Sequence, residues 1–154
     1  MDVGIINPFL EATLDVTSSM AQLTAVIGAP ALKHGKIAQG EVTGYIELNG
    51  PLYIGSLAIT FSKAALLLVY ERMLGENLSE LDDSTVDLAG EITNMVCGGA
   101  KKRLAEKGYQ FSLSRPKLLT GQQHEIQHQG PGPVITLPLQ LGDGEMFIEV
   151  CLNH

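Results

Sequence analysis

The strongest constraint on the fold of this chain is a repeated order of elements, because each half has a long helical segment followed by a β-hairpin. The first helix is predicted to begin at Asn7-Pro8, since proline is favoured in a first helical turn, and to end near Gly28. The second is predicted to be capped by Asp83-Ser84 and to run to about Lys107, where Gly108 closes it. This repetition indicates an internal duplication.

Two turn sequences place the hairpins. Asn49-Gly50 is a strong hairpin signal because both residues tolerate positive φ, and Gly142-Asp143-Gly144 marks the second turn. Pro138 would put its strand at a sheet edge or beside a bulge. In the duplication, residues 57–61 would correspond to residues 147–151. The four strands expected are residues 42–48, 52–61, 134–141 and 145–152.

The remaining segments complete an α+β pattern. A short helix is predicted over residues 63–73, with Gly75 ending it, and a strand over residues 109–114. The stretches 29–40 and 120–133 are predicted to be loops. We therefore expect one domain over residues 1–154, in which an antiparallel-rich sheet packs against long helices with a pseudo-twofold α-β-β repeat.

Composition limits the classes of function. Of 154 residues, 45% are hydrophobic and 18% charged, which suits a folded core. The net charge of -7 argues against nucleic acid as a partner, and the one basic run, Lys101-Lys102-Arg103, is interpreted as a solvated helix face. No apolar stretch approaches the ~20 residues that span a bilayer, and no signal peptide is recognised. Cys97 and Cys151 are expected to be free, buried thiols in a cytoplasmic protein.

One helix carries most of the candidate chemistry. Residues three and four apart share a helix face, so Asp87, Glu91, Asn94, Gly98 and Lys101 form one polar stripe. The opposite face is apolar and suits the core; it contains Val86, Ala89, Ile92, Val96, Ala100 and Leu104.

Two interpretations of this stripe stay open from the residues alone. A polar stripe is typical of the solvated face of an amphipathic helix. Asparagine disfavours helix interiors, however, because its side chain competes for backbone hydrogen bonds. Gly98 and Gly99 each cost ~1 kcal/mol relative to alanine in a helix. Gly98, in line with Glu91 and Asn94, would let another protein's backbone approach closely, whereas Gly99 would serve packing beneath the helix.

The same helix carries a resemblance to a known family. The pattern Asp-x-x-x-Glu-x-x-Asn, followed by glycine and later by proline, resembles the signature of the CheC, CheX and FliY phosphatases of bacterial chemotaxis. Segments 7–13 and 44–50, together with Gly55, are similar to the same family, so the resemblance covers most of the chain. The residues that match the signature are Asp87, Glu91, Asn94, Gly98 and Pro116.

The number of active copies separates the branches of this family. In the first helix Glu11 aligns with Glu91, but Leu14 stands where Asn94 would be, so the first copy is expected to be inactive. One working motif resembles the CheX branch, since CheC typically carries two.

The resemblance implies a CheC-like fold and a phosphatase that hydrolyses the aspartyl phosphate of a CheY-like receiver domain. Asn94 would orient the attacking water and Glu91 would pair with a receiver lysine, while Asp87, Gly98 and Lys101 would contact the partner. The receiver would bring its own Mg²⁺, so the chain is expected to need no cofactor or metal of its own. A homodimer is also implied. The alternative is a non-catalytic receiver-binding module similar to flagellar switch proteins.

One segment matches a zinc-protease motif in sequence but lacks the helical context that the motif requires. His124-Glu125-Ile126-Gln127-His128 matches H-E-x-x-H, which holds zinc only when a helix brings both histidines to one face. Gly121 precedes it and Gly130 to Pro133 follow, which leaves little room for a helix. We therefore predict a polar surface loop here, with bound zinc in purified protein as the contrary finding.

Overall fold

The computed structural model describes residues 5–153 and has an antiparallel sheet with helices on one face, which confirms the predicted α+β class. The elements in chain order are α1 (Ile6–Ala21), β1 (Val26–Ile27), β2 (Ala31–Leu32), β3 (Val42–Asn49), β4 (Ile54–Phe61), α2 (Lys63–Leu74), α3 (Asp83–Glu106), β5 (Ser112–Leu113), β6 (Lys117–Thr120), β7 (Val134–Leu141) and β8 (Gly144–Asn153). No helix within the described residues is long and apolar enough to cross a membrane.

The strand order of the sheet reveals the duplication. The order is β1-β7-β8-β4-β3-β5, with β2 also paired to β7 and β6 also paired to β3. Each half therefore contributes a helix, two short strands and a hairpin. The short strands of one half pair with the hairpin of the other half, and β4 and β8 meet at the centre. The repeat unit is thus larger than the predicted α-β-β unit, and the two halves cannot form their sheets separately.

Side-chain alternation corrects the predicted correspondence between the halves. Leu57 and Ile59 of β4 lie in the main core, and so do Ile148 and Val150 of β8. Matching residues 57–61 with 147–151 would place side chains of opposite faces together, so that alignment is wrong by an odd number of residues. A shift of one residue exchanges the two faces because successive strand side chains point to opposite sides.

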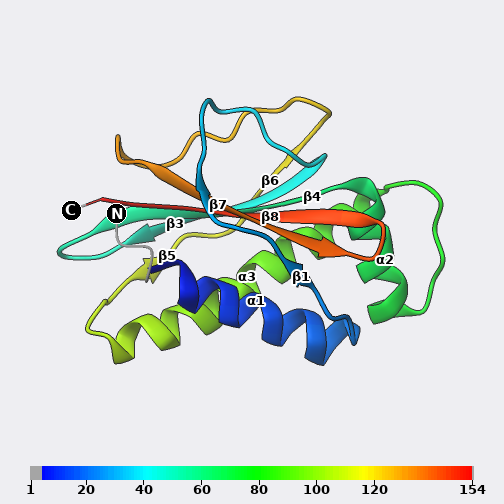
Figure 1. Ribbon diagram of the computed structural model, residues 1–154, viewed down its shortest axis with the longest axis horizontal. Helices are drawn as coiled ribbons and strands as arrows, with labels where there is room; N and C mark the ends of the chain where they lie inside the picture. The colour runs from blue at the N-terminus through cyan, green and yellow to red at the C-terminus, as the bar shows by residue number, and fades with distance from the viewer. Residues whose placement is uncertain (1–4, 154) are drawn as a thin grey trace.

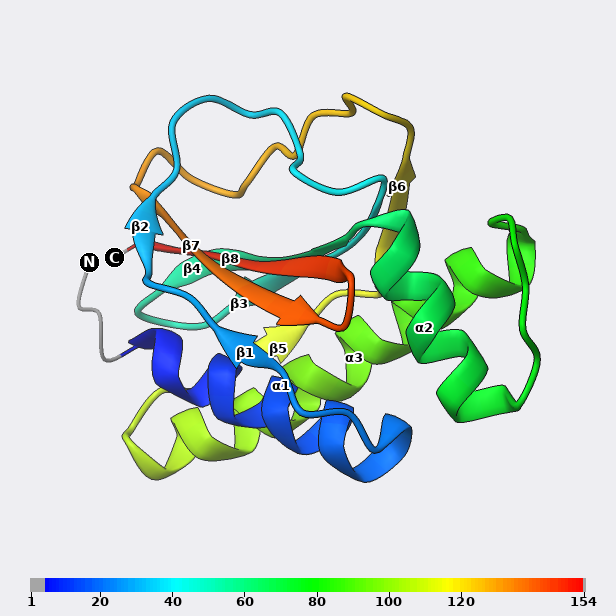
Figure 2. The same ribbon diagram turned by 45° about the vertical axis from the view of Figure 1, so that its right-hand side comes forward.

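The sheet is covered on both faces. Figure 1 shows α1 and α3 lying beneath it, with the two long connections, residues 33–41 and 121–133, above it. Figure 2 shows α1 and α3 side by side, with α2 at one end of the sheet. The main core lies between the sheet and the helices, and a smaller cluster of Ala38, Tyr45, Ala58 and Ile126 lies under the connections.

Two predicted boundaries are wrong because of local conformation. α1 ends at Ala21, where Gln22 takes a left-handed conformation (φ 53°), and Val26–Ile27 form β1 instead of a last helical turn. The first hairpin does not turn at Asn49-Gly50 through positive φ. Instead, residues 50–53 form the loop, and the Gly50 N–H donates to the Tyr53 carbonyl at 2.9 Å.

Short outer strands account for the other differences. The strand predicted over 109–114 is reduced to β5, and β6 and β2 fall in stretches that had no strand assignment. Such segments of two to four residues become strands only through pairing, so no alternation marks them in the sequence. Pro138 lies opposite the break between β1 and β2, where its carbonyl accepts the Gly28 N–H at 2.8 Å. The missing N–H of proline therefore costs no ladder hydrogen bond on that side.

Candidate functional site

The position of α3 is fixed at its N-terminal end by a capping box. Asp82, one residue before the predicted cap, accepts from the Thr85 N–H at 2.9 Å, while the Thr85 hydroxyl accepts from the Asp82 N–H at 2.8 Å. Reciprocal bonds of this kind satisfy two N–H groups that the first turn leaves without partners. The beginning of the helix is therefore held in one conformation.

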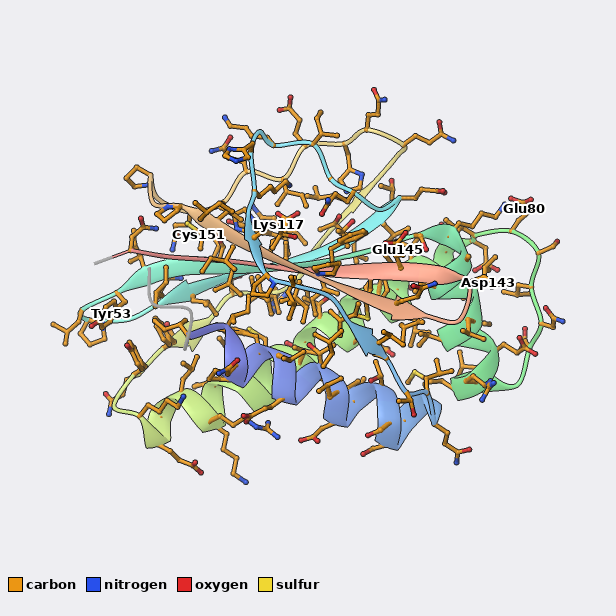
Figure 3. All side chains as sticks on the ribbon, in the orientation of Figure 1. Tyr53, Glu80, Lys117, Asp143, Glu145 and Cys151 are labelled. Carbon is orange, nitrogen blue, oxygen red and sulfur yellow. The ribbon has the colours of Figure 1, made fainter. Side chains whose placement is uncertain are left out.

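The middle and the far end of α3 are held by packing. Thr93 donates to the Ala89 carbonyl at 2.7 Å and lies against Gly44 of β3, where an added Cβ would collide with the Thr93 hydroxyl. Beyond the helix, Tyr109 contacts Tyr53, with ring centroids 5.1 Å apart. Figure 3 shows Tyr53 at the tip of the β3–β4 hairpin. The helix thus lies close against β3 along its length.

The predicted polar stripe lies on the opposite face of α3. Asp87, Glu91, Asn94, Gly98 and Lys101 are all exposed, and the inner face of the helix is buried. Within residues 5–153, the side chains of the four non-glycine members of the stripe have neither hydrogen-bond nor ion-pair partners. The structure therefore brings all five predicted residues together on one open surface.

The adjacent glycines Gly98 and Gly99 of α3 differ in their surroundings, as predicted. A Cβ added at Gly98 would meet nothing within 4 Å, so this position leaves an open spot in the stripe. A Cβ added at Gly99 would lie 3.2 Å from the Ala12 Cβ of α1. Gly99 therefore permits the close packing of α1 on α3, whereas Gly98 leaves its position on the outer surface without a side chain.

The first copy of the motif, which the sequence predicts to be inactive, is engaged in an ion pair. Glu11 of α1 lies 3.3 Å from Arg103 of α3, and Asp15 pairs with the same guanidinium. Arg103 is half-buried, so the prediction of a solvated basic run holds for Lys101 and Lys102 only. Leu14, which replaces the asparagine, is half-buried against the core. On α1 the carboxylate of Glu11 is therefore held by Arg103, and a leucine rather than a carboxamide follows it three residues later.

Chemically, the stripe offers positioning groups rather than a nucleophile. A carboxamide both donates and accepts hydrogen bonds, so Asn94 can orient a water molecule, and a carboxylate one turn away at Glu91 can hold a cation. Cys97, the nearest thiol on α3, is buried, and burial raises its pKa to about 12. It is therefore a neutral core side chain, as the sequence predicted.

The segment 124–128 is irregular, as predicted, and its two histidines make separate hydrogen bonds. The His124 ring bonds to the Thr43 hydroxyl at 2.6 Å and to the Gly121 carbonyl at 2.7 Å, and no group of metal-binding side chains is found within the described residues. It is not the surface loop that was predicted, however. Ile126 and His128 are buried against the sheet, because the connection folds over its far face.

His128 belongs to a buried polar network. Its Nδ1 lies 2.7 Å from the Ser56 hydroxyl and its Nε2 lies 2.9 Å from Glu149, which also holds Lys33 at 2.8 Å. Serine, histidine and an acid in series are typical of hydrolases. Here Ser56 and Glu149 are fully buried, so no substrate can reach them. The network is structural, and it joins both long connections to the sheet.

Leu118 is the surface residue next to the stripe that the sequence analysis missed. It lies on β6 and covers Gly90, where an added Cβ would be 3.1 Å from the leucine Cδ2. A leucine in a short strand of unremarkable sequence gives no signal of this position.

Two sequence comparisons with known proteins indicate the same family. The family described as "Chemotaxis phosphatase CheX" matches residues 42–140. A CheY-P phosphatase CheX from Thermotoga maritima is 26% identical over 149 residues, which are 96% of this chain and 94% of that protein.

Solved structures agree with this match. A CheC-like superfamily protein from Shewanella sp. PV-4 has a TM-score of 0.93 and 41% identity, covering 100% of both chains. A CheX from Vibrio vulnificus has a TM-score of 0.91 and 38% identity, covering 98% of this chain and 100% of that one. A CheX from Borrelia burgdorferi, solved in a CheX-CheY-BeF3-Mg²⁺ complex, has the same fold, with a TM-score of 0.80 and 23% identity over 99% of this chain and 100% of that one.

Proposed function

The chain belongs to the CheX family of chemotaxis phosphatases, and from this we propose that it hydrolyses the aspartyl phosphate of a CheY-like receiver domain. The observation that carries the proposal is the pair of Glu91 and Asn94, one helical turn apart, exposed and without partners on a helix held at both ends. A site built for a second protein needs such groups on its open surface, because the reacting bond lies on the partner. In this proposal, residues 1–154 form one catalytic domain.

Asn94 acts by placing the attacking water. The water attacks phosphorus in line, the bond to the receiver's aspartyl oxygen breaks, and inorganic phosphate and the free carboxylate are released. Such a reaction needs little covalent chemistry from the protein, so positioning supplies most of the catalysis. A carboxamide suits the role because it contacts both the proton and the lone pair of one water.

Glu91 anchors the receiver by pairing with a lysine beside the phosphorylated aspartate. Gly98 allows close approach of the receiver backbone, since nothing stands above it, and Asp87 and Lys101 make outer contacts. Mg²⁺ belongs to the receiver in this scheme; the Borrelia burgdorferi complex, which contains CheY and Mg²⁺, supports that assignment.

The decisive experiment measures phosphate release from a phosphorylated CheY-like receiver with Mg²⁺. We expect Asn94→Ala to lower the rate ~10²-fold, which corresponds to about 2.7 kcal/mol of barrier, while receiver binding stays near that of the wild type. Glu91→Ala should weaken binding. Asn77→Ala and Glu106→Ala, which make the same chemical changes at exposed positions off the stripe, are the matched controls and should change neither quantity.

The results separate the phosphatase from a docking module. Equal hydrolysis by Asn94→Ala and the wild-type chain would exclude the role of Asn94. Tight binding of receivers without any acceleration would favour the non-catalytic module instead. The homodimer and the cytoplasmic location remain predictions; mass measurement in solution and cell fractionation test them. Exposed apolar side chains on the outer strands β1 and β2, at Val26, Ile27 and Leu32, are compatible with pairing of two copies.

A further inference from the structure

A hollow of about 520 Å³ lies at the N-terminal end of α3, beside the polar stripe. Its walls come from the loop before α3, the first turns of the helix, β6 and the start of β3. Leu81, Val86 and Leu118 give it an apolar surface, and Leu118 is 38% exposed. An exposed leucine over a hollow with half-buried apolar walls leaves apolar surface in water that a partner side chain would cover.

The hollow is continuous with the stripe through Leu118. This side chain lies directly on Gly90, and Gly90 is three residues from Asp87 and four from Asn94. Residues at these spacings share a helix face, so Leu118 borders the stripe on the side of Asp87 and Asn94 rather than the side of Glu91. A protein that covers Asn94 is therefore placed over Leu118 as well.

The rim of the hollow is acidic. Glu41, Asp82 and Asp83 line it, and no basic residue does. Lys117, the neighbour of Leu118, stands opposite Tyr45 in the register of β6 with β3. Strand side chains alternate, so Lys117 points to the face of the sheet where Tyr45 is buried, away from the hollow. Figure 3 labels Lys117 on that face, away from the helices. The rim therefore favours a partner segment that carries positive charge.

We propose that this hollow is a second contact site for the phosphorylated receiver domain, receiving an apolar side chain from a receiver segment that has a basic residue next to it. The inference rests on the proposed function, because the stripe places the receiver. The hollow then selects among receivers: one with an acidic or bulky polar residue at that point binds weakly, although its phosphorylated aspartate is the same.

The test compares surface variants with a CheY-like receiver in two forms, phosphorylated for turnover and beryllofluoride-bound with Mg²⁺ for equilibrium binding. Leu118→Ser should raise both KM and Kd about tenfold and leave kcat unchanged, as expected when one apolar contact of an interface is removed. Glu41→Lys should raise KM and reduce the salt dependence of binding. If Leu118→Ser fails to fold, Glu41→Lys still tests the contact site by itself.

Two controls make the same chemical changes elsewhere. Leu52→Ser alters a leucine that is 73% exposed at the tip of the β3–β4 hairpin, and Glu106→Lys reverses a charge at the far end of α3. Both should leave KM and Kd unchanged.

The outcomes distinguish this inference from the proposed function. Wild-type KM and Kd in both Leu118→Ser and Glu41→Lys would overturn the second contact site, even if Asn94→Ala abolished turnover. Binding of the beryllofluoride-bound receiver without turnover would overturn the phosphatase, while the Kd values of the four variants would still decide the contact site. A wild-type chain that binds no receiver would overturn both.

Discussion

Replacing Glu149 with alanine is expected to destabilise the fold strongly without touching the stripe. Glu149 lies on the central strand β8 with its side chain fully buried. One carboxylate oxygen holds Lys33 at 2.8 Å and the other holds His128 at 2.9 Å. The side chains of these partners are only 6% and 5% exposed. Removing the carboxylate therefore leaves a buried ammonium group without its counter-charge.

The size of the effect follows from burial. Removing one partner of a buried ion pair lowers the free energy of unfolding by about 3–5 kcal/mol, because the remaining charge stays buried without a counter-charge. His128 loses a hydrogen bond in addition, since its Nε2 donates to Glu149 when its Nδ1 accepts from the Ser56 hydroxyl. The free energy of unfolding of a native domain is about 5–15 kcal/mol, so Glu149→Ala removes a large part of the total stability.

Urea unfolding followed by circular dichroism measures this loss. Glu149→Gln keeps a hydrogen-bond acceptor for His128 but removes the charge, so it should recover only part of the stability. The double variant Lys33→Met with Glu149→Gln removes both charges and should be more stable than Glu149→Gln alone, because no uncompensated ion remains.

Glu91→Ala is the matched control, since it removes an exposed carboxylate and should change the unfolding free energy by less than about 0.5 kcal/mol. A loss below about 1 kcal/mol for Glu149→Ala would refute the reasoning. It would mean that Lys33 reaches water easily and that the long connections are held to the sheet by other contacts.

Three further predictions concern α3 and its neighbours. Gly98→Ala should raise the unfolding free energy by up to about 1 kcal/mol, because the position is open and alanine favours a helix, but should weaken receiver binding. Gly44→Ala should lower it by about 1–3 kcal/mol, since its Cβ collides with Thr93; unchanged urea midpoints would contradict the close packing. The raised pKa of Cys97 makes stability fall as pH rises above 9.0, because the unfolded thiol releases its proton first. The excess stability of the wild-type chain over Cys97→Ala should thus shrink by roughly 1 kcal/mol per pH unit there, and a constant difference between pH 8 and 10, measured in urea, would show that the thiol ionises freely.

Local chemistry explains what could be predicted from the sequence. The spacing of Asp87, Glu91 and Asn94 determines that they share a helix face, because helical geometry depends only on position along the chain. The long strands were predictable for the same reason, since alternation and the turn residues at residues 142–144 act over short distances. The position of α3 in the sequence and its apolar face were therefore predicted, together with every residue of the stripe.

Other features depend on segments that meet only in the folded chain. β1 and β6 exist because the opposite half of the molecule offers them a strand edge, and two to four residues carry no periodic signal of their own. The burial of His128 likewise depends on Lys33 and Glu149, which are more than one hundred residues apart along the chain. Long-range packing of this kind is decided by shape and charge in three dimensions, and sequence spacing does not encode it.

The sequence by itself determined the chemistry of the site, namely a carboxylate and a carboxamide one turn apart on a long amphipathic helix. Only the tertiary structure decided what surrounds them. It sets Leu118 and an acidic hollow beside Asn94, and it pairs Glu11 of the first copy with Arg103. The physical reason is that side-chain direction along a helix follows from local geometry, whereas neighbours from other elements are chosen by the packing of the whole core.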